Sequence, residues 1–145
     1  MNSKAFLSLI LLLAGLPFSY AKETYEDVIV SEVISIYDGD TFRVDIDNYP
    51  EIIGKNMPIR VKGIDTPEIR TRCNTEKNLA RNAKKLTVSL LRKAKIIELK
   101  NIERGKYFRL VADVFVDGKL LSKELIKSNL AVPYDGKTAK IDWCS

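Results

Sequence analysis

A chain of 145 residues is long enough for one modest domain, and its 46% hydrophobic and 30% charged composition excludes a disordered tail. A formal net charge of +5 is compatible with nucleic acid or an anionic membrane surface as a partner, and equally with plain solubility. The chain has no histidine, which excludes histidine-based triads, general bases and zinc sites. Its chemistry must therefore use carboxylates, Arg, Lys, Tyr or a metal with oxygen ligands.

Residues 1–21 are predicted to be a secretory signal peptide. Lys4 supplies the positive start, residues 5–18 are mostly apolar, and Ser19-Tyr20-Ala21 is a small-x-small cleavage site. The apolar run is short for a membrane span, although an uncleaved anchor is the alternative. We expect cleavage after Ala21, a secreted or periplasmic monomer without stable membrane association, and one domain over residues 22–145.

The only two cysteines, Cys73 and Cys144, are predicted to form a disulfide if the protein is exported to an oxidising compartment. The bond would hold the C-terminus against the segment that follows Glu68. Two cysteines without histidine do not favour zinc.

Alternating apolar residues predict five strands, at 28–36, 41–46, 57–64, 95–103 and 107–116. Asp38-Gly39 is a hairpin signal between the first two strands, and Asp117-Gly118 signals another turn. The polar stretch 47–56 contains Pro50 and Gly54 and is predicted to be a loop.

One long helix is predicted at 75–94, with Thr75 as its N-cap. Leu79, Ala83, Leu86 and Leu90 recur there at helical spacing. A short helix is predicted at 122–128, followed by an irregular tail at 133–145. The order of elements predicts a mainly β (α+β) fold. It is typical of a five-stranded OB-type barrel with one long and one short helix, a fold that binds nucleic acid.

Four carboxylates gather at the ends of two predicted strands: Asp38, Asp40, Asp65 and Glu68. Each alone is explained by a turn or a helix cap. Together they would repel one another unless a cation lay between them. Asp40 and Asp65 are hard oxygen ligands suited to calcium, whose six to eight ligands would include a backbone carbonyl and waters.

Two arginines complete the set of candidate residues. Arg60 lies in the strand that leads to Asp65, and Arg109 lies at the start of the last predicted strand. Either could be an ordinary surface side chain, but guanidinium groups fit phosphate oxygens in a bidentate manner. Arginines, a metal and a spare carboxylate together suit phosphodiester hydrolysis.

These residues stand in an order that resembles the staphylococcal nuclease family. Its first signature matches Asp38-Gly39-Asp40-Thr41 followed by Arg-Val-Lys-Gly-Ile-Asp-Thr-Pro-Glu at 60–68. Its second signature matches Lys106-Tyr107-Phe108-Arg109 and the apolar strand after it. The resemblance covers about residues 28–131.

The resemblance implies an OB-fold enzyme that uses calcium to cut DNA and RNA. It implies Asp40, Asp65 and the Thr66 carbonyl as calcium ligands, with Asp38 beside them. The catalytic residues that it implies are Arg60, Glu68 and Arg109. Lys106 and Tyr107 match positions beside the bound nucleotide.

The chain departs from the family pattern in four places. The segment between Val44 and Arg60 is longer, Phe42 replaces a usual aliphatic residue, Phe108 stands where the family usually has Gly, and the long C-terminal helix is missing. Because the carboxylates and arginines are all present, we expect a nuclease. The alternatives are an OB-fold nucleic-acid-binding module without catalysis and a plain periplasmic binding or envelope protein.

Overall fold

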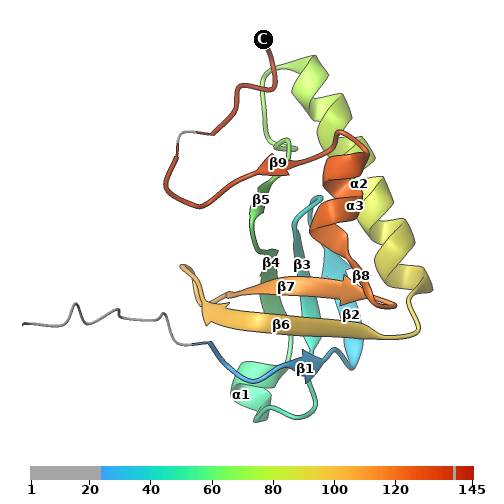
Figure 1. Cartoon of the computed structure of the whole chain (residues 1–145), viewed down its shortest axis with the longest axis vertical. Coiled ribbons are helices and arrows are strands. Elements are labelled where there is room, and N and C mark those ends of the chain that lie inside the picture. The colour runs from blue at the N-terminus through green and yellow to red at the C-terminus, as the bar shows by residue number, and fades with distance from the viewer. Residues whose placement is uncertain (1–23, 139) are drawn as a thin grey trace, which may run out of the picture.

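The computed structural model describes residues 24–138 and 140–145, and Figure 1 shows how their elements are arranged. The predicted signal peptide at 1–21 lies outside the described residues. Helices occupy α1 (Glu51–Gly54), α2 (Asn74–Lys93) and α3 (Leu121–Lys127). Strands occupy β1 (Val28–Ile29), β2 (Glu32–Ile36), β3 (Thr41–Asp45), β4 (Met57–Val61), β5 (Ile64–Asp65), β6 (Ile97–Arg104), β7 (Leu110–Val116), β8 (Lys119–Leu120) and β9 (Val132–Pro133).

The main sheet has the strand order β1-β6-β7-β4-β3-β2, with β8 paired to β7. Its two outer strands, β1 and β2, are consecutive in the chain. The amide of Val30 bonds Ile97 of β6 (2.9 Å), and the amide of the next residue, Ser31, bonds Asp45 of β3 (2.8 Å). The segment predicted as one strand at 28–36 is therefore interrupted at these two residues, and it curls the sheet by pairing with both of its edges.

The strands alternate as the sequence predicts. On β3, Phe42 and Val44 are fully buried, while Arg43 faces outward. On β7, Leu110 and Ala112 are buried, and Val111 between them is partly exposed. The mixed α+β architecture and the curled sheet confirm the predicted OB-like fold.

Helix α2 begins one residue earlier than predicted. Its N-cap is Cys73, whose sulfur accepts a hydrogen bond from the Glu76 amide at 3.3 Å, so the prediction of Thr75 as N-cap is wrong. The buried face of the helix contains Ala83 and Thr87. A Cβ atom at Gly39 would lie 2.8 Å from Cβ of Ala83, so only glycine allows the turn before β3 to pack this closely on the helix.

The predicted loop at 47–56 contains the short helix α1, at the end of the sheet opposite the C-terminus (Figure 1). Gly54 closes this segment by accepting a hydrogen bond from the Ile46 amide at 2.8 Å. The tail predicted to be irregular contributes β9, which pairs with β5. Among the described residues, no helix is long and apolar enough to cross a membrane.

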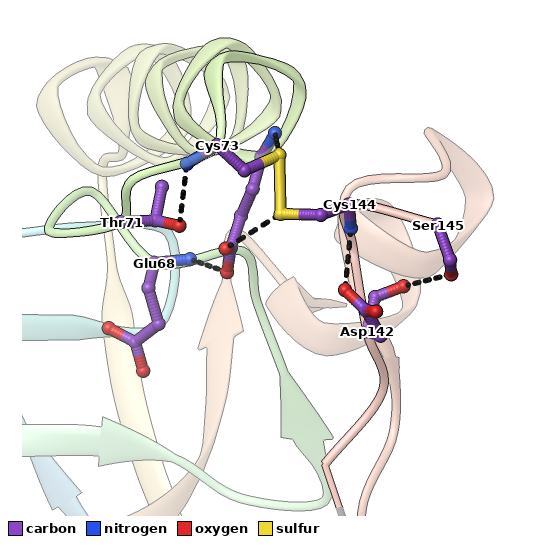
Figure 2. The surroundings of a disulfide bond; sticks show 7 residues. Glu68, Thr71, Cys73, Asp142, Cys144 and Ser145 are labelled. Atoms are coloured by element: carbon purple, nitrogen blue, oxygen red, sulfur yellow. Dashed lines mark hydrogen bonds between the residues drawn. A yellow bond between two sulfur atoms is a disulfide. The ribbon is translucent and has the colours of Figure 1, made fainter.

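The predicted disulfide joins Cys73 to Cys144, with 5.9 Å between their Cα atoms (Figure 2). It attaches the C-terminal tail to the start of α2. The same helix end holds the loop that follows β5, because Oε1 of Glu76 accepts the amide hydrogen of Glu68 at 2.9 Å. The bond thus lies close to one of the candidate site residues.

Candidate carboxylate and arginine site

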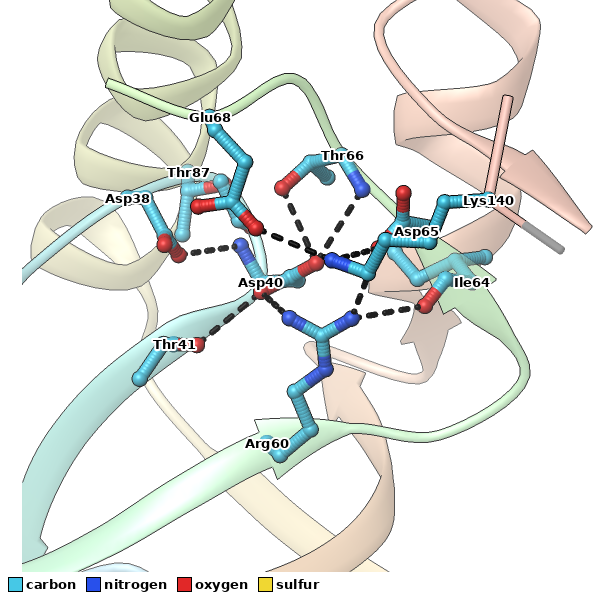
Figure 3. A network of polar contacts seen from close by, with 11 residues as sticks. Asp38, Asp40, Thr41, Arg60, Ile64, Asp65, Thr66, Glu68, Thr87 and Lys140 are labelled. Atoms are coloured by element: carbon cyan, nitrogen blue, oxygen red, sulfur yellow. Dashed lines mark hydrogen bonds and ion pairs between the residues drawn. The ribbon is translucent and has the colours of Figure 1, made fainter. Parts of the chain in front are cut away.

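Asp40 is the centre of the polar cluster in Figure 3. It ends the turn between β2 and β3, and its side chain is fully buried. Oδ2 accepts hydrogen bonds from the Thr66 amide (3.1 Å) and hydroxyl (2.9 Å), and Oδ1 accepts from the Thr41 hydroxyl (2.9 Å) and from Arg60. These donors satisfy the buried carboxylate and hold it in one orientation.

Arg60 links the two strand ends that carry the carboxylates. It projects from β4, where it pairs with Thr41 in the ladder. One guanidinium nitrogen contacts Asp40, and the other lies 3.2 Å from Oδ1 of Asp65 and 3.3 Å from the Ile64 carbonyl oxygen. The structure therefore brings together Asp40, Asp65 and Arg60, which are distributed over 26 positions of the sequence.

Asp38 lies beside Asp40 and is also buried. Its Oδ1 accepts the amide hydrogen of Asp40 at 3.1 Å. Burial and the neighbouring charge of Asp40 raise the pKa of Asp38 to about 7. At neutral pH this carboxyl group is thus divided between its protonated and ionised forms, unlike an ordinary surface aspartate.

Sequence reasoning did not identify Lys140 as part of this cluster. Its ammonium nitrogen lies 3.1 Å from Oδ1 of Asp65 and 2.9 Å from Oε1 of Glu68. Desolvation lowers the pKa of Lys140, but the hydrogen bonds to Glu68 and Asp65 more than offset this, so the pKa is raised. The C-terminal tail thereby places a permanent positive charge between two candidate site carboxylates, as Figure 3 shows.

Glu68 differs from the three aspartates because its side chain is 48% exposed. Its backbone is fixed by the bond to Glu76, while its carboxylate reaches Lys140. Water can therefore reach this carboxylate, whereas Asp40 and Asp65 are closed off from solvent at 0% and 3% exposure of their side chains.

The oxygen atoms in this cluster are of the type that calcium prefers, but they are already occupied. Arg60 and Lys140 supply the positive charge between the carboxylates. No group of three or more His, Cys, Asp or Glu side chains that could hold a metal ion is found within residues 24–138 and 140–145. A metal would have to replace at least one of the two cationic side chains.

Lys106, Tyr107 and Arg109 form a second group on the turn between β6 and β7. The predicted strand at 107–116 is wrong at its start, because Tyr107 and Phe108 have φ angles of 58° and 55° and β7 begins at Leu110. In the described part of the chain, Arg109 forms no ion pair with the carboxylates, and its buried Nε has no hydrogen-bond partner. Arg109 nevertheless lies directly before β7, which runs beside β4, the strand of Arg60.

Two comparisons with known proteins identify the family of the chain. The family model described as "Staphylococcal nuclease homologue" matches residues 58–142, which include Arg60, Asp65, Glu68 and Arg109. The chain is 34% identical over 134 residues to Endonuclease YncB of Bacillus subtilis (strain 168). That alignment covers 89% of this chain and 59% of the relative, so the chain spans about three-fifths of the relative's length. The chain belongs to the staphylococcal nuclease homologue family.

Proposed function

We propose that the protein is a calcium-dependent nuclease that hydrolyses phosphodiester bonds in DNA and RNA. The observation that carries the proposal is the convergence of Asp40, Asp65 and Glu68 around Arg60 and Lys140. Membership of the family and the similarity to an endonuclease support the same reaction.

Calcium would be held by Asp40, Asp65 and the Thr66 carbonyl. The fit is supported by Lys140, because Asp65 and Glu68 already hold a cation, the chain's own ammonium group, at 3.1 and 2.9 Å. The three proposed calcium ligands are all hard oxygens, as calcium requires. When bound, the ion would supply positive charge that polarises the phosphate and stabilises the transition state.

The side chains of the site would have separate roles in the reaction. Arg60, and Arg109 with its unpartnered Nε, would bind phosphate oxygens and neutralise the charge that develops on them. Glu68 would orient a water molecule and accept its proton, which is consistent with its 48% exposure. Asp38 would hold the turn that carries Asp40, and Lys106 and Tyr107 would contact the nucleotide.

We also propose that the protein acts as a monomer after export, in the periplasm or outside the cell. The disulfide between Cys73 and Cys144 supports export, since such bonds persist in oxidising compartments. Sequencing the N-terminus of the exported protein would test it. A start at Lys22 is expected, and a retained Met1 would contradict it.

The reaction is tested by incubating the purified protein with plasmid DNA and with single-stranded RNA, in calcium and in excess chelator. Cutting in calcium that chelator abolishes is the expected result. Full activity in chelator would refute the calcium requirement. Tight binding without any cutting would favour the alternative, a nucleic-acid-binding module.

A further inference from the structure

A shallow pocket of about 230 Å³ lies at the end of β4 away from the carboxylate cluster. Its lining includes Arg43 on β3, Ile52 on α1, Pro58 on β4, and the two aromatic residues of the β6–β7 turn. Both the segment with α1 and Phe108 are departures from the family pattern. Apart from Tyr107, the pocket is therefore lined by residues of this chain to which the proposed function gives no role.

Large apolar side chains are unusually exposed around this pocket. Tyr107 is 87%, Phe108 58% and Ile52 86% exposed. A cluster of this kind on a soluble surface marks a binding site more often than isolated apolar residues do.

The aromatic residues are also held in a backbone conformation that aromatic side chains rarely adopt. Tyr107 and Phe108 are consecutive and both have positive φ angles. The turn is closed by the Gly105 amide, which donates to the Arg109 carbonyl at 2.8 Å. Strained backbone that displays side chains to solvent is characteristic of functional sites.

A guanidinium group lies against each of the two aromatic rings. The guanidinium of Arg104 lies 4.7 Å from the Phe108 ring centre, and that of Arg109 lies 5.9 Å from the Tyr107 ring centre. Among the described residues, neither arginine forms an ion pair, and nor does Lys106. Rings flanked by unpaired cations suit a ligand that is both aromatic and anionic, as nucleic acid is.

The sheet register places the pocket and the carboxylate cluster on one face. Pro58 and Arg60 are two positions apart on β4, with Ile59 buried between them. That separation corresponds to roughly 7 Å along the strand. On β3, Arg43 and Thr41, which pair with them, also face outward. A few nucleotides of one strand can therefore reach from the pocket to Arg60.

We propose that this pocket is a subsite for an unpaired nucleobase, which stacks on Phe108 while the backbone of the same strand continues past Arg109 to the carboxylate cluster. The inference rests on the proposed nuclease function and deepens it. It makes single strands the favoured substrate, because the bases of a duplex are already stacked and cannot enter the pocket.

Binding can be measured without cutting, by fluorescence anisotropy of labelled single-stranded oligonucleotides in excess chelator. Phe108→Ala should weaken binding of an eight-nucleotide strand roughly tenfold, the range found for loss of one stacked base. It should leave the affinity for a duplex of the same length unchanged, because paired bases are already stacked and cannot enter the pocket. Phe108→Trp should restore binding of the single strand.

Phe115→Ala is the matched control, since Phe115 also lies under a cation, Lys100 at 5.3 Å, but toward the other end of β7. It should leave binding unchanged. Phe108→Gly distinguishes a loss of binding from a loss of folding. Glycine suits the positive φ angle, so the melting temperature should stay the same or rise while binding of the single strand weakens.

Wild-type affinity in Phe108→Ala and Phe108→Gly would overturn the subsite. An equal loss for the duplex and the single strand would overturn it too, because the bases of a duplex cannot enter the pocket. The outcome is separate from the proposed reaction. A wild type that never cuts, but whose binding depends on Phe108, would refute the nuclease and retain the subsite.

Discussion

The ammonium of Lys140 lies 2.9 Å from the carboxylate of Glu68, although the two residues are 72 positions apart in the chain. The same nitrogen lies 3.1 Å from Asp65. Cys144, four residues later, is bonded to Cys73 at the start of α2, so the tail cannot move far from the cluster. If calcium binds as proposed, Lys140 would compete with it for the oxygen atoms of Asp65.

Removing this lysine should strengthen calcium binding. Lys140→Ala deletes a positive charge that competes for Asp65 and Glu68, and we expect calcium to bind at least about tenfold more tightly. Isothermal titration calorimetry measures this without substrate. Lys137→Ala, an exposed lysine of the same tail, removes the same net charge and should change affinity little. Weaker calcium binding in Lys140→Ala would mean that the lysine supports the site.

The disulfide should stabilise the fold substantially. Its chain-entropy contribution for a loop of 71 residues is about 4 kcal/mol, and measured values for such bonds are commonly lower. Urea unfolding of oxidised protein, reduced protein and the Cys73→Ser/Cys144→Ser variant should show the same loss of stability in the last two. Identical midpoints in all three would contradict this. Alkylation of exported protein without reductant should find no free thiol.

Asp38 should make stability fall as pH rises from about 4 to 7. Its folded pKa of about 7 lies above the unfolded value of 3.8, so the folded state holds the proton more strongly in this window. Ionising it costs up to about 4 kcal/mol at higher pH. Asp38→Asn keeps an acceptor for the Asp40 amide, and should therefore be more stable than wild type at pH 8 but not at pH 4.

Urea unfolding at the two pH values measures this difference. Asp27→Asn is the control, because exposed Asp27 also accepts a backbone amide hydrogen, from Asn101 at 3.3 Å. An equal shift at pH 4 and pH 8 in Asp38→Asn would exclude titration of Asp38 as the cause.

Replacing Arg60 and replacing Arg109 should affect calcium affinity differently. Arg109 touches none of the carboxylates, so Arg109→Ala should slow cutting roughly a hundredfold and leave calcium affinity unchanged. Arg60 contacts Asp40 and Asp65, so Arg60→Ala should change both quantities. Single-turnover rates and calorimetry separate them, with exposed Arg81→Ala as control. An unimpaired rate in Arg109→Ala would remove that residue from the site.

The sequence was sufficient for the longer strands of the main sheet and for the long helix, because these depend on local patterns. Alternation placed β3, β4, β6 and β7, and the candidate carboxylates lie in the turn before β3, at the end of β5 and in the loop after β5. The start of β3 lies beside Arg60 near the end of β4 because these two strands are neighbours in the sheet.

Three features depended on contacts that no local pattern encodes. Lys140 is one of several lysines in a polar tail, and only the disulfide and the packing of β9 bring it to Asp65. The break at Val30 and Ser31 arises because the two halves of that segment pair with different edges. The turn at Tyr107 adopts positive φ angles that its aromatic sequence disfavours.

The most direct test of the proposed site is the single-turnover rate of Glu68→Gln on a labelled single strand in saturating calcium. Glutamine keeps the size of this half-exposed side chain but cannot accept a proton from water. We predict that the variant folds, binds calcium and strand, and cuts about a hundred- to ten-thousand-fold more slowly, while the exposed Glu26→Gln cuts normally. Cutting by Glu68→Gln at the wild-type rate would contradict the site as proposed.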